Sequence, residues 1–202
     1  MIMYRFLHFI FSHLFSFLFD AEIIGKENMP MNGGVILAAN HMSNWDPPFL
    51  ATYLDRTVSY MAKKELFEVP ILKQIITSCF AFPVKRGAAD RGAIKAALSE
   101  LKKGHCLGLF PEGTRSKDGK VHKAESGIAL IAALGKVPVV PAAIIGTDKI
   151  FSSKKFFPKL KLIYGQPIFF EGKNNNKEEL QNFSKKIMEE IEKMKKLYSE
   201  SI

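Results

Sequence analysis

Apolar segments of two kinds alternate along this chain, some with the spacing of strands and others with the spacing of helices. Short apolar runs bounded by glycine, proline or polar residues predict buried strands, and they lie at residues 33–40, 57–63, 80–87, 106–113, 137–146 and 159–165. Helical spacing and helix-boundary residues predict helices at 70–79, 88–103, 124–134 and 177–198. This alternation predicts an α/β fold, with a mostly parallel or mixed central sheet covered by helices on both faces.

The first 22 residues differ from this pattern, because they are dense in phenylalanine and contain no strand signal. Their apolar run is too short and too polar for a membrane span, which needs about 20 mostly apolar residues. Four polar residues recur at steps of three and four, which places them on one stripe of a helix: Arg5, His8, Ser12 and Ser16. This predicts an N-terminal membrane-associating helix, with its polar stripe facing the protein or the lipid headgroups. An ordinary buried core helix is the alternative.

The length and composition limit the classes of protein that remain. With 202 residues, we expect an anchoring segment at 1–22 and one α/β domain at 23–202. The net charge of +9 indicates an anionic partner: nucleic acid, an anionic membrane or a phosphorylated substrate. Scattered lysines without a binding motif argue against nucleic acid. Cys79 and Cys106 lie in apolar stretches, which predicts buried free thiols, and no Cys or His pair has the spacing of metal ligands.

A polar turn at the end of the first predicted strand, with the sequence NHMSNWD, is the first candidate for chemistry. His41 and Asp46 would diverge on a continuous helix, whereas a turn allows them to approach each other. An aspartate bonded to one imidazole nitrogen fixes the tautomer and leaves the other nitrogen free as a base. Histidine has an unperturbed pKa of about 6.5, which suits deprotonation of a hydroxyl near neutral pH. The alternative is a plain turn in which Asp46 caps a helix.

A second candidate is the loop LFPEGTRSKDG, which follows another predicted strand. Gly113 allows a ligand to approach the backbone closely. Arg115 can hold a phosphate through two parallel hydrogen bonds, with the hydroxyls of Thr114 and Ser116 beside it. Ligands of open α/β sheets bind beyond the carboxyl ends of strands, where both motifs fall. Two such loops are harder to explain as plain turns than one.

These motifs resemble the glycerophospholipid acyltransferase family, and the chain is most similar to its bacterial 1-acylglycerol-3-phosphate acyltransferases. The family's first block, Asn-His-x-Ser-x-x-Asp, matches residues 40–46. Its third block, Phe-Pro-Glu-Gly-Thr-Arg-Ser, matches residues 110–116, and its apolar fourth block matches residues 137–141. The second block ends in an arginine that Arg86 matches, but Lys85 stands where the family often has aspartate.

The resemblance implies direct acyl transfer from a thioester, without an acyl-enzyme. By this analogy His41 takes the proton from the free hydroxyl of lysophosphatidic acid, and Asp46 orients the imidazole. The substrate-binding residues that it implies are Arg86, Glu112, Gly113, Thr114 and Arg115. Acyl-CoA or acyl carrier protein would be the co-substrate, with no further cofactor and no metal. The product would be phosphatidic acid, formed in phospholipid biosynthesis.

The expected partners are therefore lysophosphatidic acid, the acyl donor and an anionic membrane surface, and not nucleic acid. We expect monotopic or peripheral attachment at the cytoplasmic face of the cell membrane. Two alternatives remain open. The same residues could acylate glycerol-3-phosphate or another lysophospholipid. A non-catalytic, basic membrane-surface protein could also have this fold, although the presence of both His41 and Asp46 argues against it.

Overall fold

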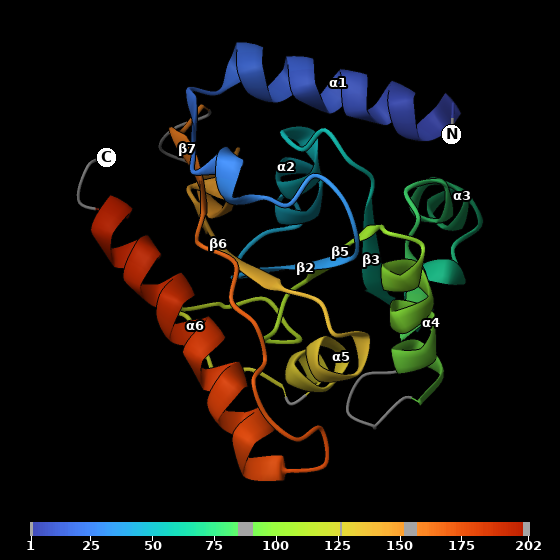
Figure 1. Cartoon of the computed structure of the whole chain (residues 1–202). Helices are drawn as coiled ribbons and strands as arrows, with labels where there is room; N and C mark the ends of the chain where they lie inside the picture. Colours follow the sequence, from blue (N-terminus) through green and yellow to red (C-terminus); the bar gives the residue numbers. More distant parts are fainter. Residues whose placement is uncertain (1, 85–90, 126, 152–156, 200–202) are drawn as a thin grey trace.

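The alternating segments form one seven-stranded sheet with helices on both faces (Figure 1). The computed structural model describes residues 2–84, 91–125, 127–151 and 157–199. The strands are β1 (Ala21–Ile24), β2 (Val35–Ala39), β3 (Val58–Lys63), β4 (Phe82–Val84), β5 (Cys106–Leu109), β6 (Val139–Ile145) and β7 (Leu160–Tyr164). The helices are α1 (Ile2–Leu18), α2 (Asp46–Thr52), α3 (Pro70–Ser78), α4 (Arg91–Lys102), α5 (Gly127–Gly135) and α6 (Lys177–Ser199).

The sheet is mixed, with a parallel centre, as the sequence predicts. The strand order is β1-β7-β6-β2-β5-β3-β4, and β6 pairs with β7 in the antiparallel direction while the other pairs are parallel. Because β2 lies between β5 and β6, its carboxyl end is at the middle of the sheet. This central edge is where open α/β sheets bind their ligands.

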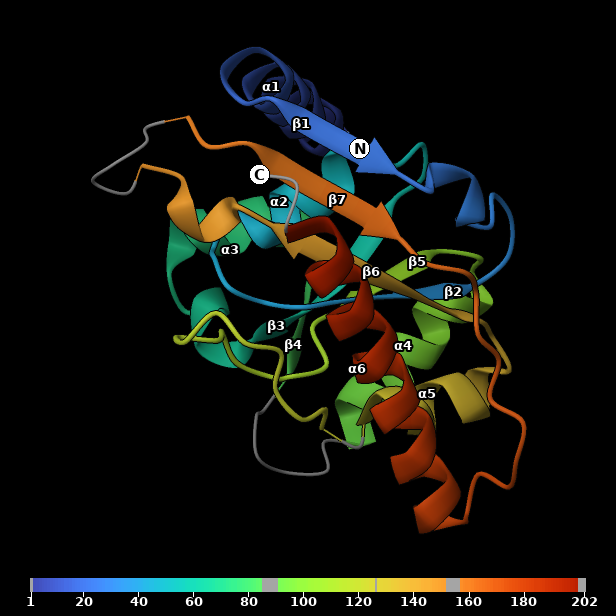
Figure 2. The same cartoon turned by 90° about the vertical axis from the view of Figure 1, so that its left-hand side faces the viewer.

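Both faces of β2 are buried, which explains why its sequence is apolar without a break. Val35, Leu37 and Ala39 pack into the core beneath α1 and α2. Ile36 and Ala38, on the opposite face, pack against α4, α5 and α6. Since successive side chains of a strand point to opposite faces, a strand covered on both sides needs apolar residues throughout. Figure 2 shows α6 lying across one face, with α1 beyond the other.

Two short elements were not predicted. The four residues of β1 begin at Ala21 and extend the sheet at its edge by pairing with β7. The seven residues of α2 start at Asp46 and carry proline in their first turn, where its missing N–H costs no hydrogen bond. The predicted strand 106–113 is longer than β5, and β4 begins at Phe82, two residues after its predicted start. Arg86 and Lys85 lie outside the described residues.

Helix α1 has one face on the protein and another in solvent. Phe15 and Phe19 are buried in the core, and the Phe15 ring meets the Phe49 ring of α2 with 5.1 Å between centroids. The opposite face exposes large apolar side chains, namely Met3, Phe6, Phe9, Ile10 and Phe17. The predicted polar stripe therefore does not point into the core: Arg5 and Ser16 are exposed, and His8 and Ser12 are half-buried. Within the described residues, α1 and every other helix are too short or too polar to cross a bilayer.

Candidate active site

The two candidate loops meet at the carboxyl ends of the neighbouring strands β2 and β5. The Ser116 amide donates to the His41 carbonyl oxygen at 2.8 Å. The His41 amide in turn donates to Oε1 of Glu112 at 3.2 Å. These backbone contacts hold the two loops in one fixed arrangement, although 71 positions separate His41 from Glu112 in the sequence.

The predicted contact between His41 and Asp46 is formed. Nδ1 of His41 lies 2.8 Å from Oδ2 of Asp46. The His41 side chain is 12% exposed and that of Asp46 is fully buried. Within the described residues Nδ1 is the ring nitrogen that hydrogen-bonds, so Nε2 is available to a substrate. With Nδ1–H donated to the carboxylate, Nε2 carries the free lone pair of a base.

Asp46 is fixed by more than the histidine. Its Oδ2 also accepts hydrogen bonds from the amides of Met42, at 2.6 Å, and Ser43, at 2.7 Å. Its Oδ1 accepts the hydroxyl of Thr147, which lies just beyond β6 and is itself buried. Because charge-assisted hydrogen bonds to a buried carboxylate are strong, this network holds the carboxylate in one orientation. Thr147 was missed in the sequence, where nothing marks it as a partner of Asp46.

The imidazole of His41 also packs against aromatic rings. The rings of His41 and Phe110 stack with 4.1 Å between centroids and 20° between planes. Tyr60 stacks on Phe110 at 6.3 Å and donates its hydroxyl to the Pro47 carbonyl oxygen at 2.8 Å. The ring of His41 is thus fixed by both stacking and its hydrogen bond. Phe110 stands in the matched motif, but the sequence gives no sign that it contacts His41.

Asn40, directly before the histidine, has a structural task. Its side chain is buried and exchanges two hydrogen bonds with the backbone of Ile144, at 2.9 and 2.8 Å. These bonds continue the pairing of β2 and β6 by one more position. Asn40 therefore fixes where the strand ends and where the histidine begins.

The buried carboxylate of Glu112 connects the two candidate loops through hydrogen bonds. Its Oε2 accepts the amide of His122 at 3.2 Å, while Oε1 accepts that of His41. The side chain is 8% exposed, and burial raises the pKa of its carboxyl against the opposing effect of these hydrogen bonds. Since both oxygens are engaged by backbone amides, the geometry fits a positioning role better than direct contact with a substrate.

An open cavity of about 410 Å³ lies at the second candidate loop. It is lined by Thr114, Arg115, Ser116, Lys117, Asp118 and His122. Nη1 of Arg115 donates to Oδ1 of Asn44 at 3.0 Å, which places the guanidinium beside the histidine loop. Gly113 has a φ of 68°, a left-handed conformation that favours glycine, and an added Cβ would lie 3.3 Å from Cγ of Glu125. The cavity lining thus combines two cations and two hydroxyls, which are groups that bind phosphate, with the carboxylate of Asp118.

Comparisons with known proteins find similar sequences and a similar fold among acyltransferases. A family model described as Acyltransferase matches residues 20–145. The 1-acyl-sn-glycerol-3-phosphate acyltransferase of Bacillus subtilis (strain 168) is 35% identical over 169 residues, which are 82% of this chain and 82% of that protein. A protein of the same name from Streptococcus pneumoniae is 32% identical, over 79% of this chain and 60% of the relative. The crystal structure of the 1-acyl-sn-glycerophosphate (LPA) acyltransferase PlsC from Thermotoga maritima matches with a TM-score of 0.74 at 28% identity, over 95% of this chain and 80% of that one.

Proposed function

Because this chain belongs to the acyltransferase family, we propose that it transfers a fatty acyl group from an acyl thioester to the free hydroxyl of 1-acylglycerol-3-phosphate. The product is phosphatidic acid. The observation that carries the proposal is the buried contact of 2.8 Å between His41 and Asp46, which leaves Nε2 of the histidine free. Arg115, which lines the cavity, contacts Asn44 of the same loop. The names of the relatives support the choice of acceptor.

In the proposed reaction His41 is the general base. Nε2 takes the proton of the substrate hydroxyl as its oxygen forms a bond to the thioester carbonyl carbon. The tetrahedral intermediate then collapses, the carbon–sulfur bond breaks, and the departing sulfur takes up the proton from the imidazolium. Asp46 holds the imidazole in place and stabilises the imidazolium. A base placed in this way contributes about 10²–10⁴-fold to the rate.

The substrate phosphate binds in the cavity beside Arg115. A guanidinium matches the geometry of a phosphate and retains its charge at all physiological pH values. The hydroxyl of Thr114 lies in the same cavity lining. The hydrogen bond from Ser116 to His41 keeps the distance from the phosphate site to the base fixed, which is what positioning of the hydroxyl requires. We assign Arg86 to the same phosphate from its motif alone.

The donor is acyl-CoA or acyl carrier protein, both of which are acidic and suit a chain with a net charge of +9. We place the protein at the cytoplasmic face of the membrane, attached peripherally through α1. Support comes from the exposed apolar face of this helix, on which Phe17 is 89% exposed. The apolar side chains of this face, which are costly to leave in water, would be buried among lipid.

The test is an assay of the purified chain against a panel of lysolipids and glycerol-3-phosphate, with each donor in turn. We expect release of thiol and formation of the acylated product to be fastest with 1-acylglycerol-3-phosphate. The same panel with His41→Ala measures the background. Faster turnover of another acceptor would overturn the substrate assignment, and no transfer to any acceptor would overturn the proposed function.

A further inference from the structure

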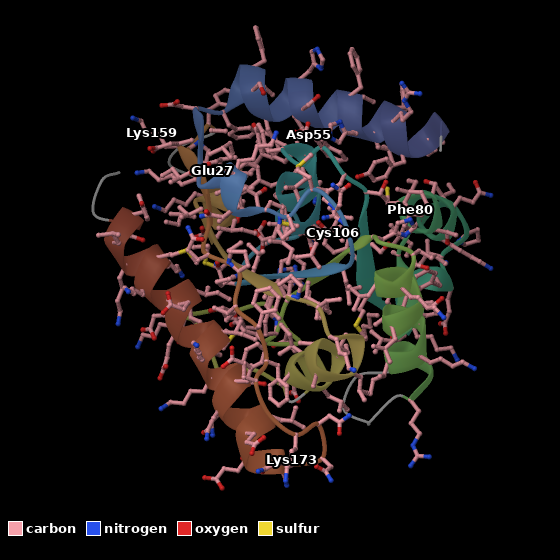
Figure 3. The ribbon with its side chains drawn as sticks, in the orientation of Figure 1. Glu27, Asp55, Phe80, Cys106, Lys159 and Lys173 are labelled. Atoms are coloured by element: carbon pink, nitrogen blue, oxygen red, sulfur yellow. The ribbon has the colours of Figure 1, made fainter. Side chains whose placement is uncertain are left out.

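A second cavity, of about 320 Å³, lies far from the histidine loop, beneath α1. Its lining residues are Tyr4, Arg5, His8, Leu54, Asp55, Arg56 and Thr57. Figure 3 shows Asp55 under the middle of α1. Arg56 donates to the carbonyl oxygens of Gly33, at 2.5 Å, and Gly104, at 2.7 Å, which lie just before β2 and β5. The cavity is therefore at the amino ends of the strands, opposite the candidate active site, and we call it the amino-edge cavity.

The charges in the amino-edge cavity favour an anion. Arg56 is half-buried, and its described hydrogen bonds go to carbonyl oxygens, so no carboxylate among the described residues neutralises it. Arg5 is exposed and forms no ion pair within the part of the chain that the structure describes. The carboxylate of Asp55 is paired with Nζ of Lys26 at 2.7 Å. The lining thus carries two guanidinium charges and one carboxylate, that of Asp55, and neither arginine forms an ion pair within the described residues.

The position of the cavity relates this charge to the lipid surface. Arg5 and His8 belong to the polar stripe of α1, which lies between its protein-facing side and its exposed apolar face. Phe6 and Phe9, on the exposed face, are 56% and 59% exposed. A lipid whose chains lie along this apolar face would have its phosphate near the level of the stripe, because headgroups sit at the boundary of the apolar layer.

We propose that the amino-edge cavity binds a phosphate group, held by hydrogen bonds from Arg5 and attracted by the charge of Arg56, at a site separate from the substrate phosphate site at Arg115. The Arg5 guanidinium can bind phosphate through paired, charge-assisted hydrogen bonds. Arg56 contributes its charge alone, because Nη1 and Nη2 already donate to backbone carbonyl oxygens. An anionic lipid is the source that fits the apolar face of α1, and this part rests on the membrane location proposed above. Free phosphate has the same chemistry, and the experiment separates the two sources.

The experiment measures binding of the full chain to vesicles of phosphatidylcholine with and without phosphatidylglycerol. Arg5→Gln should lower the preference for phosphatidylglycerol vesicles about fivefold, whereas binding to phosphatidylcholine alone should change less than about twofold. Arg5→Lys, which retains the charge, should keep most of the preference. Lys173→Gln is the matched control, because it removes the same charge at the opposite end of the molecule (Figure 3), beyond the range of screened attraction.

A second arm tests free phosphate by thermal unfolding in inorganic phosphate and in chloride at matched ionic strength. In one outcome, phosphate stabilises the unmodified chain, Arg5→Gln reduces this stabilisation, and the chain shows no preference for phosphatidylglycerol vesicles. That outcome would support the site, with free phosphate as its ligand. If Arg5→Gln changes neither vesicle preference nor phosphate stabilisation, the site is wrong. Turnover of a dispersed short-chain lysolipid should be the same in Arg5→Gln and the unmodified chain. A complete lack of turnover in the unmodified chain would instead count against the proposed function alone.

Discussion

Two histidine–aspartate pairs lie on neighbouring loops of this molecule, and their contact distances are the same. His41 and Asp46 are 2.8 Å apart, and so are Nε2 of His122 and Oδ1 of Asp118. The environments differ: the side chains are 12% and 0% exposed in the first pair, but 52% and 50% exposed in the second. Distance alone would therefore not separate a base in an active site from a surface turn.

The difference lies in what fixes each aspartate. Asp46 is buried and accepts the Thr147 hydroxyl from a distant part of the chain. Asp118 accepts only from its own loop among the described contacts, at 2.9 Å from the Ser116 hydroxyl and 3.1 Å from the Lys120 amide. Water competes for an exposed pair and weakens it, whereas a buried network excludes water and keeps one geometry. Only the first arrangement holds its imidazole in one orientation, as the proposed base requires.

The largest effect should come from removing each histidine in turn. We expect His41→Ala to lower kcat by about 10²–10⁴-fold, because it removes the proposed base. His122→Ala should leave kcat within about threefold, since its imidazole is exposed and takes no proton in the proposed reaction. Steady-state assays of both variants, with circular dichroism to verify folding, make the comparison. Equal losses in two folded variants would overturn the distinction between the pairs.

Replacing each aspartate with asparagine should affect activity and stability much more at Asp46 than at Asp118. Asp46→Asn should lower kcat about 10²-fold or more, because the amide no longer holds the imidazolium. It should also lower the free energy of unfolding by about 2 kcal/mol, since four donors lose a buried charged acceptor. Asp118→Asn should leave kcat nearly unchanged. Urea unfolding together with turnover measures both effects, and a normally active Asp46→Asn would contradict the mechanism.

Arg115 donates to Asn44 of the first loop and lines a cavity with Asp118 and His122, and its removal should have an intermediate effect. Arg115→Ala should raise the KM for the lysophospholipid about tenfold, because a charge-assisted contact to phosphate is lost. The KM for the thioester donor should change far less. Lys102→Ala is the control for a lost charge and should leave this KM unchanged, because Lys102 is exposed at the end of α4, near the amino end of β5 and away from the cavity. An increase confined to the donor's KM would mean that the cavity holds the other substrate.

The smallest effect should be a dependence of stability on acidic pH that comes from the exposed pair. Hydrogen bonds from the Lys120 amide, the Ser116 hydroxyl and His122 lower the pKa of Asp118 to about 2. Its value in the unfolded chain is about 3.9, so its stabilising contribution is present above about pH 4 and is lost as pH falls toward 2. The unmodified chain should therefore lose slightly more stability than Asp118→Asn over this range. Acid unfolding curves at low and high salt would detect the difference, which salt should diminish.

Much of the fold could be predicted because its signals are local. Unbroken apolar runs predicted the central strands, and helical spacing predicted helices α3 to α6. The predicted ends of these elements were wrong by a few residues. The elements that were missed, β1 and α2, have four and seven residues, too few to show a period. The end of β5 was predicted too late, since an apolar residue such as Phe110 continues an apolar run without continuing a strand.

For the active site, the sequence determined the parts that lie within one turn. The contact between His41 and Asp46 spans five positions, and the motif residues of the second loop are contiguous. The tertiary structure alone brought these parts together. Thr147 lies 101 positions from Asp46, and only the pairing of β6 beside β2 makes them neighbours.

For α1, the sequence likewise determined the period of the polar stripe, but only packing against Phe49 decided which face is buried and which faces solvent. Local spacing is fixed by backbone geometry, whereas a contact between distant segments depends on how the whole chain packs.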